Sequence, residues 1–136
     1  MHIKEHRSLT YSATFRPQDW LRFVEIEPFP RLWASFKLTD EDLRALQTAI
    51  MALPQNAAVI PGGGGLRKLR FSKTNSDKGK SGSYRVYYVY FPDYSIVLLM
   101  AIVDKTKRAD LNKSDVSALS QVISRVKALL DRGVIR

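Results

Sequence analysis

Two β-rich segments separated by only three residues constrain the fold of this chain more than any other feature. The segment SYRVYYVYF (83–91) is dense in β-branched and aromatic residues, and SIVLLMAIV (95–103) is an apolar run. Both compositions are typical of strands. The intervening PDY allows only a turn, which predicts two antiparallel strands. An uninterrupted apolar strand is expected at the centre of a sheet, covered on both sides.

A third strand, LRKLRF (66–71), precedes this pair and follows four glycines at 62–65. Glycine is a poor residue for the interior of a strand or helix, so the run predicts a mobile turn that leads into the strand. Because side chains alternate along a strand, Lys68 and Arg70 share one face and Phe71 lies on the other.

The same alternation in the strand 83–91 places Arg85 and Tyr87 on one face, and Tyr84 and Tyr88 on the other. Three consecutive strands with short connections predict an antiparallel meander.

The remaining elements are one strand and three helices. Residues 22–29 alternate as a strand does, and a short helix is expected through RLWASF directly afterwards. Residues 39–53 predict an amphipathic helix with Thr39 as its N-cap. The last helix is expected to begin at an N-cap that is either Asn112 or Ser114.

The order β-α-α-β-β-β-α predicts an α+β fold with a mainly antiparallel sheet and with the helices packed on one side. At 136 residues the chain suits a single domain. We assign this domain to residues 21–136, after an N-terminal extension (1–20) that shows little periodicity.

The charge of the chain is concentrated around these strands. Of the net charge of +9, residues 62–88 contribute +6, from seven Lys and Arg residues against Asp77 alone. A basic cluster of this kind, interleaved with tyrosines on two strands and their connecting loop, favours a nucleic-acid surface over a merely solubilising face.

The loop between these strands contains Gly79-Lys80-Ser81, which resembles the end of a phosphate-binding P-loop. That motif requires a glycine at position 74, where this chain has threonine, and it requires a helix directly afterwards. A strand follows instead, so the P-loop interpretation is rejected.

Composition excludes several classes of protein. The chain has no cysteine, which rules out disulfides, thiolate metal sites and cysteine nucleophiles. It has no apolar run of the roughly 20 residues that cross a bilayer, and no secretory signal at its N-terminus. We therefore expect a cytoplasmic protein that does not contact membranes.

No arrangement of Ser, His and Asp and no cluster of carboxylates accompanies the basic strands, so any chemistry must use Lys, Arg and Tyr. Metal-free cleavage of RNA by its own 2′-hydroxyl is one such reaction, and it needs no cofactor. Neighbouring cations disfavour the charged form of a lysine, which can then act as a base. Arginines stabilise the developing charge on the phosphate, and tyrosines can stack an unpaired base.

The blocks GGLRKLRF, GKSGSYRVYYVYF, an apolar strand and DKTKRADLNKSDVSAL, in this order, resemble the RelE/ParE toxin superfamily, and within it the RelE and HigB-like branch. The resemblance covers residues 22–125. It implies a RelE-like fold and the toxin of a bacterial type II toxin–antitoxin pair, an endoribonuclease (mRNA interferase) that cuts mRNA in the ribosomal A site. It also implies a cognate antitoxin, expected to be a helix-turn-helix protein, and contact with operator DNA only through the antitoxin complex.

Carried over by position, the resemblance matches Lys68, Arg70 and Arg85 to the catalytic basic residues of the family. Where relatives often have an arginine as candidate acid this chain has Thr106, so Lys105 becomes the candidate. Where some relatives have a stacking tyrosine it has Leu111 and Asn112, so a stacking residue must come from elsewhere. The residues expected to bind RNA are Arg67, Lys73, Lys78, Lys80, Tyr84, Tyr88, Lys107 and Arg108.

Two other functions remain open at this stage. ParE-like relatives share the fold but poison DNA gyrase without cutting RNA. A non-catalytic RNA-binding domain would use the same cations only to neutralise phosphates.

Overall fold

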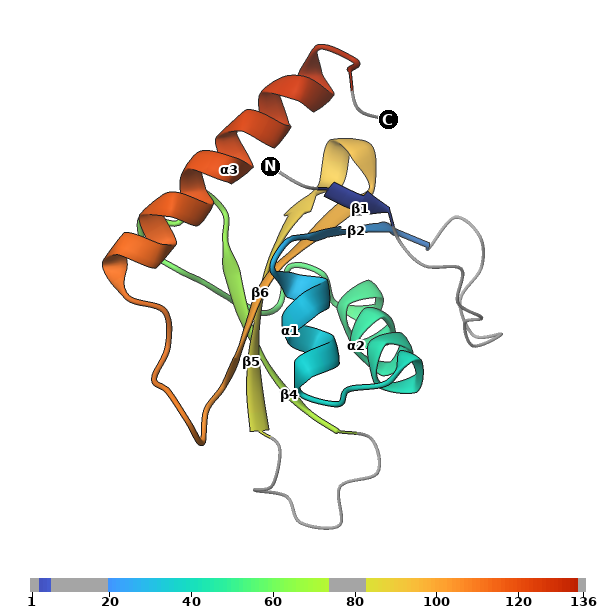
Figure 1. Cartoon of the computed structure of the whole chain (residues 1–136). Coiled ribbons are helices and arrows are strands. Elements are labelled where there is room, and N and C mark those ends of the chain that lie inside the picture. Colours follow the sequence, from blue (N-terminus) through green and yellow to red (C-terminus); the bar gives the residue numbers. More distant parts are fainter. Residues whose placement is uncertain (1–2, 6–19, 74–82, 135–136) are drawn as a thin grey trace.

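The computed structural model of the chain describes residues 3–5, 20–73 and 83–134, which form one six-stranded sheet with three α-helices (Figure 1). In chain order the elements are β1 (Ile3–Glu5), β2 (Arg22–Ile26), α1 (Phe29–Ser35), α2 (Asp40–Ala52), β3 (Ala58–Val59), β4 (Arg67–Ser72), β5 (Ser83–Phe91), the 3-10 helix η2 (Pro92–Tyr94), β6 (Ile96–Asp104) and α3 (Lys113–Asp131). The α+β class is confirmed, and so are the seven predicted elements.

The strands lie in the order β1-β2-β6-β5-β4-β3. The predicted meander is present, because β5 pairs antiparallel with both β4 and β6. Strand β2 pairs parallel with β6, with Arg22 opposite Ile96, and this is the only parallel pair among the described strands. The sheet is therefore mainly antiparallel, as predicted.

Two short edge strands are additions to the predicted fold. Strand β1 pairs antiparallel with β2, which brings residues 3–5 of the expected N-terminal extension into the sheet. Strand β3 pairs with the start of β4, where Ala58 lies opposite Lys68. Segments of two or three residues are too short to show a period of two, so nothing in the sequence distinguished them from loops.

The prediction that all helices pack on one side of the sheet is wrong. Helices α1 and α2 cover one face and α3 covers the other (Figure 1). Strand β6 is the physical reason, because its first eight residues are all buried and its two faces both need an apolar cover. On the α3 side, Ile123, Val126 and Leu130 pack in the same core as Leu98.

On the other side, Trp33 of α1 is the centre of an aromatic cluster. Its ring lies 5.5 Å from that of Phe29 and 5.6 Å from that of Phe71 on β4. Its indole nitrogen donates to the carbonyl oxygen of Thr39 at 3.2 Å. Thr39 is also the N-cap of α2, as predicted, and it forms a capping box with Asp42.

The pairing of β5 and β6 is interrupted by a β-bulge. Tyr87 lies opposite Ala101 and Tyr88 lies opposite Leu99, so Met100 is the extra residue. Met100 and Ala101 are both buried in the core on the α3 side. Beyond the bulge the register continues with Arg85 opposite Val103, at the end of the sheet where the basic residues gather.

The four glycines form a turn that is closed by backbone hydrogen bonds. The amide of Ile60 donates to the carbonyl of Leu66 at 2.9 Å, and the amide of Gly63 donates to the carbonyl of Ile60 at 3.0 Å. Gly62, Gly64 and Gly65 have positive φ angles, a conformation that other residues adopt only at a cost. The turn therefore sets the point at which β4 enters the sheet.

Of the two candidate N-caps for α3, the structure selects Asn112. Its side chain accepts from the amide of Asp115 at 2.8 Å, and the Asp115 carboxylate accepts from the amide of Asn112 at 3.3 Å.

Asn112→Ala should lower the free energy of unfolding by about 1 kcal/mol, because the first turn of the helix loses its acceptor. Ser114→Ala should change it by no more than a few tenths. Urea denaturation of the two variants measures the difference, and equal losses would contradict the assignment.

Candidate nucleic-acid interface

Two arginines face each other across β4 and β5 on the side of the sheet that α3 partly covers. Arg70 lies directly opposite Arg85, and directly opposite residues of an antiparallel pair project from the same face. Arg70 is exposed and Arg85 is half-buried. Within the described residues no carboxylate forms an ion pair with either guanidinium. Like charges placed opposite each other destabilise a sheet, so an anion between them would relieve the repulsion.

Two lysines lie next to this pair and share one carboxylate. Lys68 projects from the same face as Arg70, two residues earlier on β4. Its ammonium donates to Oδ2 of Asp110 at 2.8 Å, and the ammonium of Lys105 lies 3.4 Å from Oδ1 of the same residue. The predicted catalytic residues Lys68, Arg70 and Arg85 therefore share one face, and the loop after β6 adds Lys105 to them.

Tyr87 is the third group that contacts Asp110. The ring is 1% exposed, and its hydroxyl donates to Oδ1 of Asp110 at 3.1 Å and accepts from the amide of Leu111 at 3.3 Å. Burial raises the pKa of this hydroxyl, so it remains a proton donor at neutral pH. Tyr87 lies directly opposite Lys68 in the sheet, which ties the loop after β6 to both strands.

The hydrogen bond from Lys68 lowers the pKa of Asp110 to about 2, with smaller contributions from Tyr87 and from the charge of Lys105. A carboxylate whose pKa is lower in the folded than in the unfolded protein stabilises the fold above its unfolded pKa, and this stability is lost as the pH falls. The relevant window runs from about pH 4 down to about pH 2.

Asp110→Asn should therefore lower the stability of the protein at neutral pH by about 1 kcal/mol, a figure reduced for solvent screening because the side chain is 37% exposed. The difference from the parent should disappear as the pH falls from 4 to 2. Chemical denaturation of both proteins across this range measures it. A difference that is the same at pH 7 and pH 2 would contradict the assignment.

The loop between β6 and α3 is organised around Asp104. The carboxylate accepts from the amide of Thr106 at 2.9 Å and from its hydroxyl at 2.6 Å. This leaves Lys107 and Arg108 exposed at the rim of the site. Arg108 also lies 3.2 Å from Asp115, whose carboxylate belongs to the cap of α3. Thr106, which stands where relatives carry an arginine, is a turn residue here.

Arg67 lies apart from the other cations. Residues alternate along β4, so it projects from the face opposite to Lys68 and Arg70. Its guanidinium donates to the carbonyl oxygens of Gln55 and Ala57 at 2.9 and 2.7 Å. The structure does not bring Arg67 together with the proposed site, and its contacts hold the segment between α2 and β3.

The stacking role expected for Tyr84 and Tyr88 does not fit the structure. Both rings are buried on the face that α1 and α2 cover, with exposed fractions of 4% and 1%. Tyr84 packs on Phe36 with a centroid distance of 5.3 Å, and the hydroxyl of Tyr88 donates to the carbonyl oxygen of Pro54 at 2.9 Å. These rings cannot stack on a base because they are part of the core.

The other residues expected to bind RNA lie at the margin of the described chain. Lys73 is half-buried directly after the end of β4. Lys78 and Lys80 fall between residues 74 and 82, outside the described residues.

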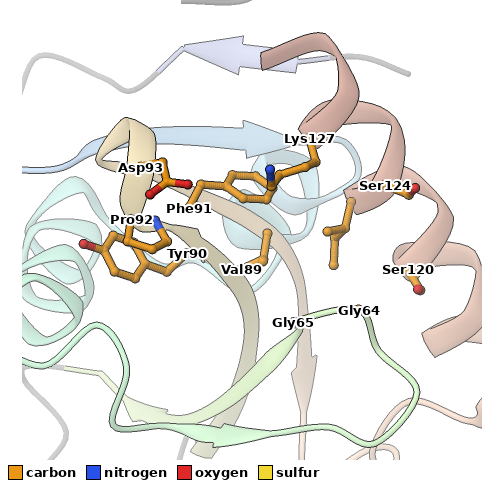
Figure 2. Close-up of a pocket in the computed structure, with 11 residues that line it drawn as sticks. Gly64, Gly65, Val89, Tyr90, Phe91, Pro92, Asp93, Ser120, Ser124 and Lys127 are labelled. Atoms are coloured by element: carbon orange, nitrogen blue, oxygen red, sulfur yellow. The ribbon is translucent and has the colours of Figure 1, made fainter. Parts of the chain in front are cut away.

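A concave feature lies on the same face but elsewhere along the sheet. This cleft, of about 570 Å³, is lined mainly by Gly64 and Gly65, the end of β5, η2 and one side of α3 (Figure 2). Lys127 is the only cationic residue in its lining, and it is paired with Asp131 at 3.0 Å. The cleft contains none of the basic residues of β4 and β5, so it takes no part in the site.

Sequence reasoning missed two residues of the site, Asp110 and Tyr87. The sequence could have identified Tyr87, because alternation alone places it on the same face of its strand as Arg85. Asp110 is a single acid at the end of the basic block KTKRAD, and its position over β4 depends on how the loop returns to α3. Nothing local in the sequence specifies that return.

Comparison of the chain with models of known protein families finds no match. In the part of the chain that the structure describes, none of the helices combines the length and the apolar character needed to span a bilayer.

Proposed function

We propose that this protein is the toxin of a bacterial toxin–antitoxin pair, and that it is a RelE-like, HigB-like endoribonuclease that cleaves mRNA on the ribosome. The observation that carries the proposal is the Arg70–Arg85 pair with Lys68 beside it on one face of the sheet. Two opposed guanidinium groups without a carboxylate partner among the described residues are suited to bind a phosphate group.

The proposed reaction uses only the groups of this face. The ribose 2′-oxygen attacks the adjacent phosphorus, the bond from phosphorus to the 5′-oxygen breaks, and the products are a 2′,3′-cyclic phosphate and a 5′-hydroxyl. Arg70 and Arg85 stabilise the charge that develops on the phosphate oxygens. Lys68 is the proposed acceptor of the 2′-hydroxyl proton, and Lys105 is the proposed donor to the leaving oxygen.

The proposal assigns no stacking platform to this chain. Tyr84, Tyr88 and Tyr87 are all buried, so a base beside the reacting phosphate has no tyrosine among them to stack on. The resemblance to the RelE and HigB-like branch implies a substrate on the ribosome, and in the proposal the ribosome orients the base in place of a tyrosine.

The test is incubation of the purified protein with programmed ribosomes and end-labelled mRNA. Cleavage within the A-site codon, with a cyclic phosphate at the new 3′ end, would support the proposal. The same RNA without ribosomes should remain intact. Supercoiling by DNA gyrase, measured in parallel, should be unaffected.

Two other results would overturn the proposal in different ways. Intact mRNA together with gyrase arrest would identify a ParE-like poison. Intact mRNA that is bound would identify a non-catalytic RNA-binding domain. That second candidate is favoured by one specific observation, the ion pair of Lys68 with Asp110, because a lysine engaged in this way is a poor proton acceptor.

A protein partner is part of the proposal. A helix-turn-helix antitoxin is expected to bind the toxin and abolish cleavage, and to carry the complex to operator DNA. Co-expression of the neighbouring gene with this chain, followed by affinity purification, tests for the complex. Failure of that gene product to co-purify or to relieve growth arrest would count against the toxin assignment.

A further inference from the structure

Three hydrogen-bond donors from three different parts of the chain converge on the Asp110 carboxylate. The ammonium of Lys68 comes from β4, the hydroxyl of Tyr87 from β5 and the ammonium of Lys105 from the loop after β6. Lys68 contacts one carboxylate oxygen at 2.8 Å, and the other two donors contact the second oxygen at 3.1 and 3.4 Å. Two cations and a neutral hydroxyl around one anion form an anion-binding arrangement.

The donors are held in place by the fold and do not depend on Asp110 alone. Tyr87 is buried, and the amide of Leu111 donates to its hydroxyl oxygen, which leaves the hydroxyl proton free to point at the anion. The backbone amide of Lys105 donates to the carbonyl of Ser83 at 3.0 Å, which fixes the start of its side chain beside β5. Lys68 lies on β4 between two paired strands, opposite Ala58 of β3 and Tyr87 of β5.

The resident anion, in contrast, remains accessible to solvent. The side chain of Asp110 is 37% exposed, and those of Lys68 and Lys105 are 34% and 30% exposed. An ammonium has three donors, and the described contacts use one in each lysine. A second anion can therefore approach both lysines from the solvent side and compete with the carboxylate.

We propose that Lys68, Lys105 and Tyr87 form a subsite for one phosphate group of RNA, and that the Asp110 carboxylate occupies this subsite when RNA is absent. The inference rests on the proposed function, since it names the RNA phosphate as the ligand of the same surface. It describes a bound state in which both lysines are still protonated and the phosphate takes the place of the carboxylate at the two ammonium groups. Lys68 must release one proton to solvent from this state before it can accept the proton of the 2′-hydroxyl.

Replacement of the carboxylate by a neutral group of the same shape should strengthen RNA binding. Asp110→Asn retains the size of the side chain and one acceptor oxygen for Tyr87, but it removes the charge that competes with phosphate. The dissociation constant for a 2′-O-methyl RNA oligonucleotide, which cannot be cleaved, should fall by about fivefold to tenfold in low salt. Asp110→Ser should shift it in the same direction, so the test does not depend on asparagine alone.

Asp93→Asn is the matched control, because it makes the same change in net charge at an exposed position in η2, outside the site. It should change the dissociation constant by less than twofold. Asp110→Glu, which keeps the charge, should bind like the parent. If Asp93→Asn and Asp110→Asn increase the affinity for RNA equally, the effect is due to net charge alone and the inference is overturned. Unchanged or weaker binding by Asp110→Asn would also overturn it.

A second measurement separates this inference from the proposed function. Inorganic phosphate should raise the thermal unfolding temperature of Asp110→Asn more than that of the parent, because a ligand that binds only the folded state stabilises it. This result requires no RNA cleavage. If phosphate stabilises Asp110→Asn but ribosomes are not cut, the subsite stands and the nuclease assignment fails. If phosphate stabilises both proteins equally, the subsite is wrong whatever the activity.

Discussion

Arg85→Ala is expected to slow cleavage of ribosome-bound mRNA by about 100-fold or more, with the fold intact. Arg85 projects from the central part of the basic face, directly opposite Arg70 on β4 and next to Val103 on β6. Arg85 is half-buried, so its surroundings are less polar than water and a contact with a developing charge is strengthened. Loss of one such contact with the transition state typically costs a few kcal/mol.

The measurement is single-turnover cleavage on programmed ribosomes, which separates the chemical step from binding. Arg125→Ala is the control, because Arg125 is an exposed arginine on α3 whose removal changes the net charge equally. It should cleave within about twofold of the parent. Arg85→Lys should give an intermediate rate, since a lysine keeps the charge but lacks the planar fork that matches phosphate.

Two outcomes would contradict this assignment. If Arg85→Ala cuts like the parent, the active site lies elsewhere. If Arg85→Ala and Arg125→Ala are slowed equally, the effect is one of overall charge on ribosome binding. Expression of Arg85→Ala in cells should also relieve growth arrest, which provides a readout that does not depend on the purified system.

Alternation predicts which residues of one strand share a face. A period of two is fixed by backbone geometry, so Lys68 could be grouped with Arg70, and Arg85 with Tyr87, before the two strands were paired. That both groups lie on the same face of the sheet depends on the register of β4 with β5, which alternation does not provide. The pairing itself follows from the short connections of the meander. Alternation does not predict whether a side chain is buried or exposed to solvent. Tyr84 and Tyr88 have the same spacing as surface residues would have, and only the packing of α1 and α2 buries them.

The layers of the fold were predictable in part. The apolar sequence of β6 already required a cover on both faces, yet the order of elements alone favoured helices on one side. Two features resolve the conflict in the structure. A parallel pairing of β2 with β6 places α1 and α2 on one face, and the apolar stripe of α3 covers the other. Both depend on contacts between segments far apart in the chain, which local patterns do not encode.

The ion pairs of the site could not be predicted from local sequence patterns either. Asp110 approaches Lys68 across 42 positions of sequence, and the distance between them is set by the loop that returns from β6 to α3. The cap at Asn112 was one of two candidates that the sequence offered, whereas the turn around Asp104 was not predicted. Their combined geometry determines where the carboxylate lies, and that geometry emerges only in three dimensions.

Binding of RNA is expected to weaken by about sevenfold when the salt concentration rises from 50 to 200 mM. Four cations of the described face are expected to engage two phosphates, one between Arg70 and Arg85 and one in the subsite of Lys68 and Lys105. Every phosphate neutralised on a single strand adds about 0.7 to the slope of log affinity against log salt, so the slope should be near −1.4. A fourfold change in salt then gives the stated loss.

Single substitutions test whether these four cations are the ones that bind. Arg70→Ala should reduce the steepness of the slope by up to about 0.7, because the phosphate between Arg70 and Arg85 loses one of its two cations. Arg67→Ala and Arg125→Ala should leave it unchanged, since Arg67 projects from the opposite face onto backbone carbonyls and Arg125 lies on the exposed side of α3. Titration of a fluorescent 2′-O-methyl RNA at several salt concentrations measures the slopes. A parent slope close to zero would remove nucleic acid as the partner, and equal changes in all three variants would mean that the basic face has no special role in binding.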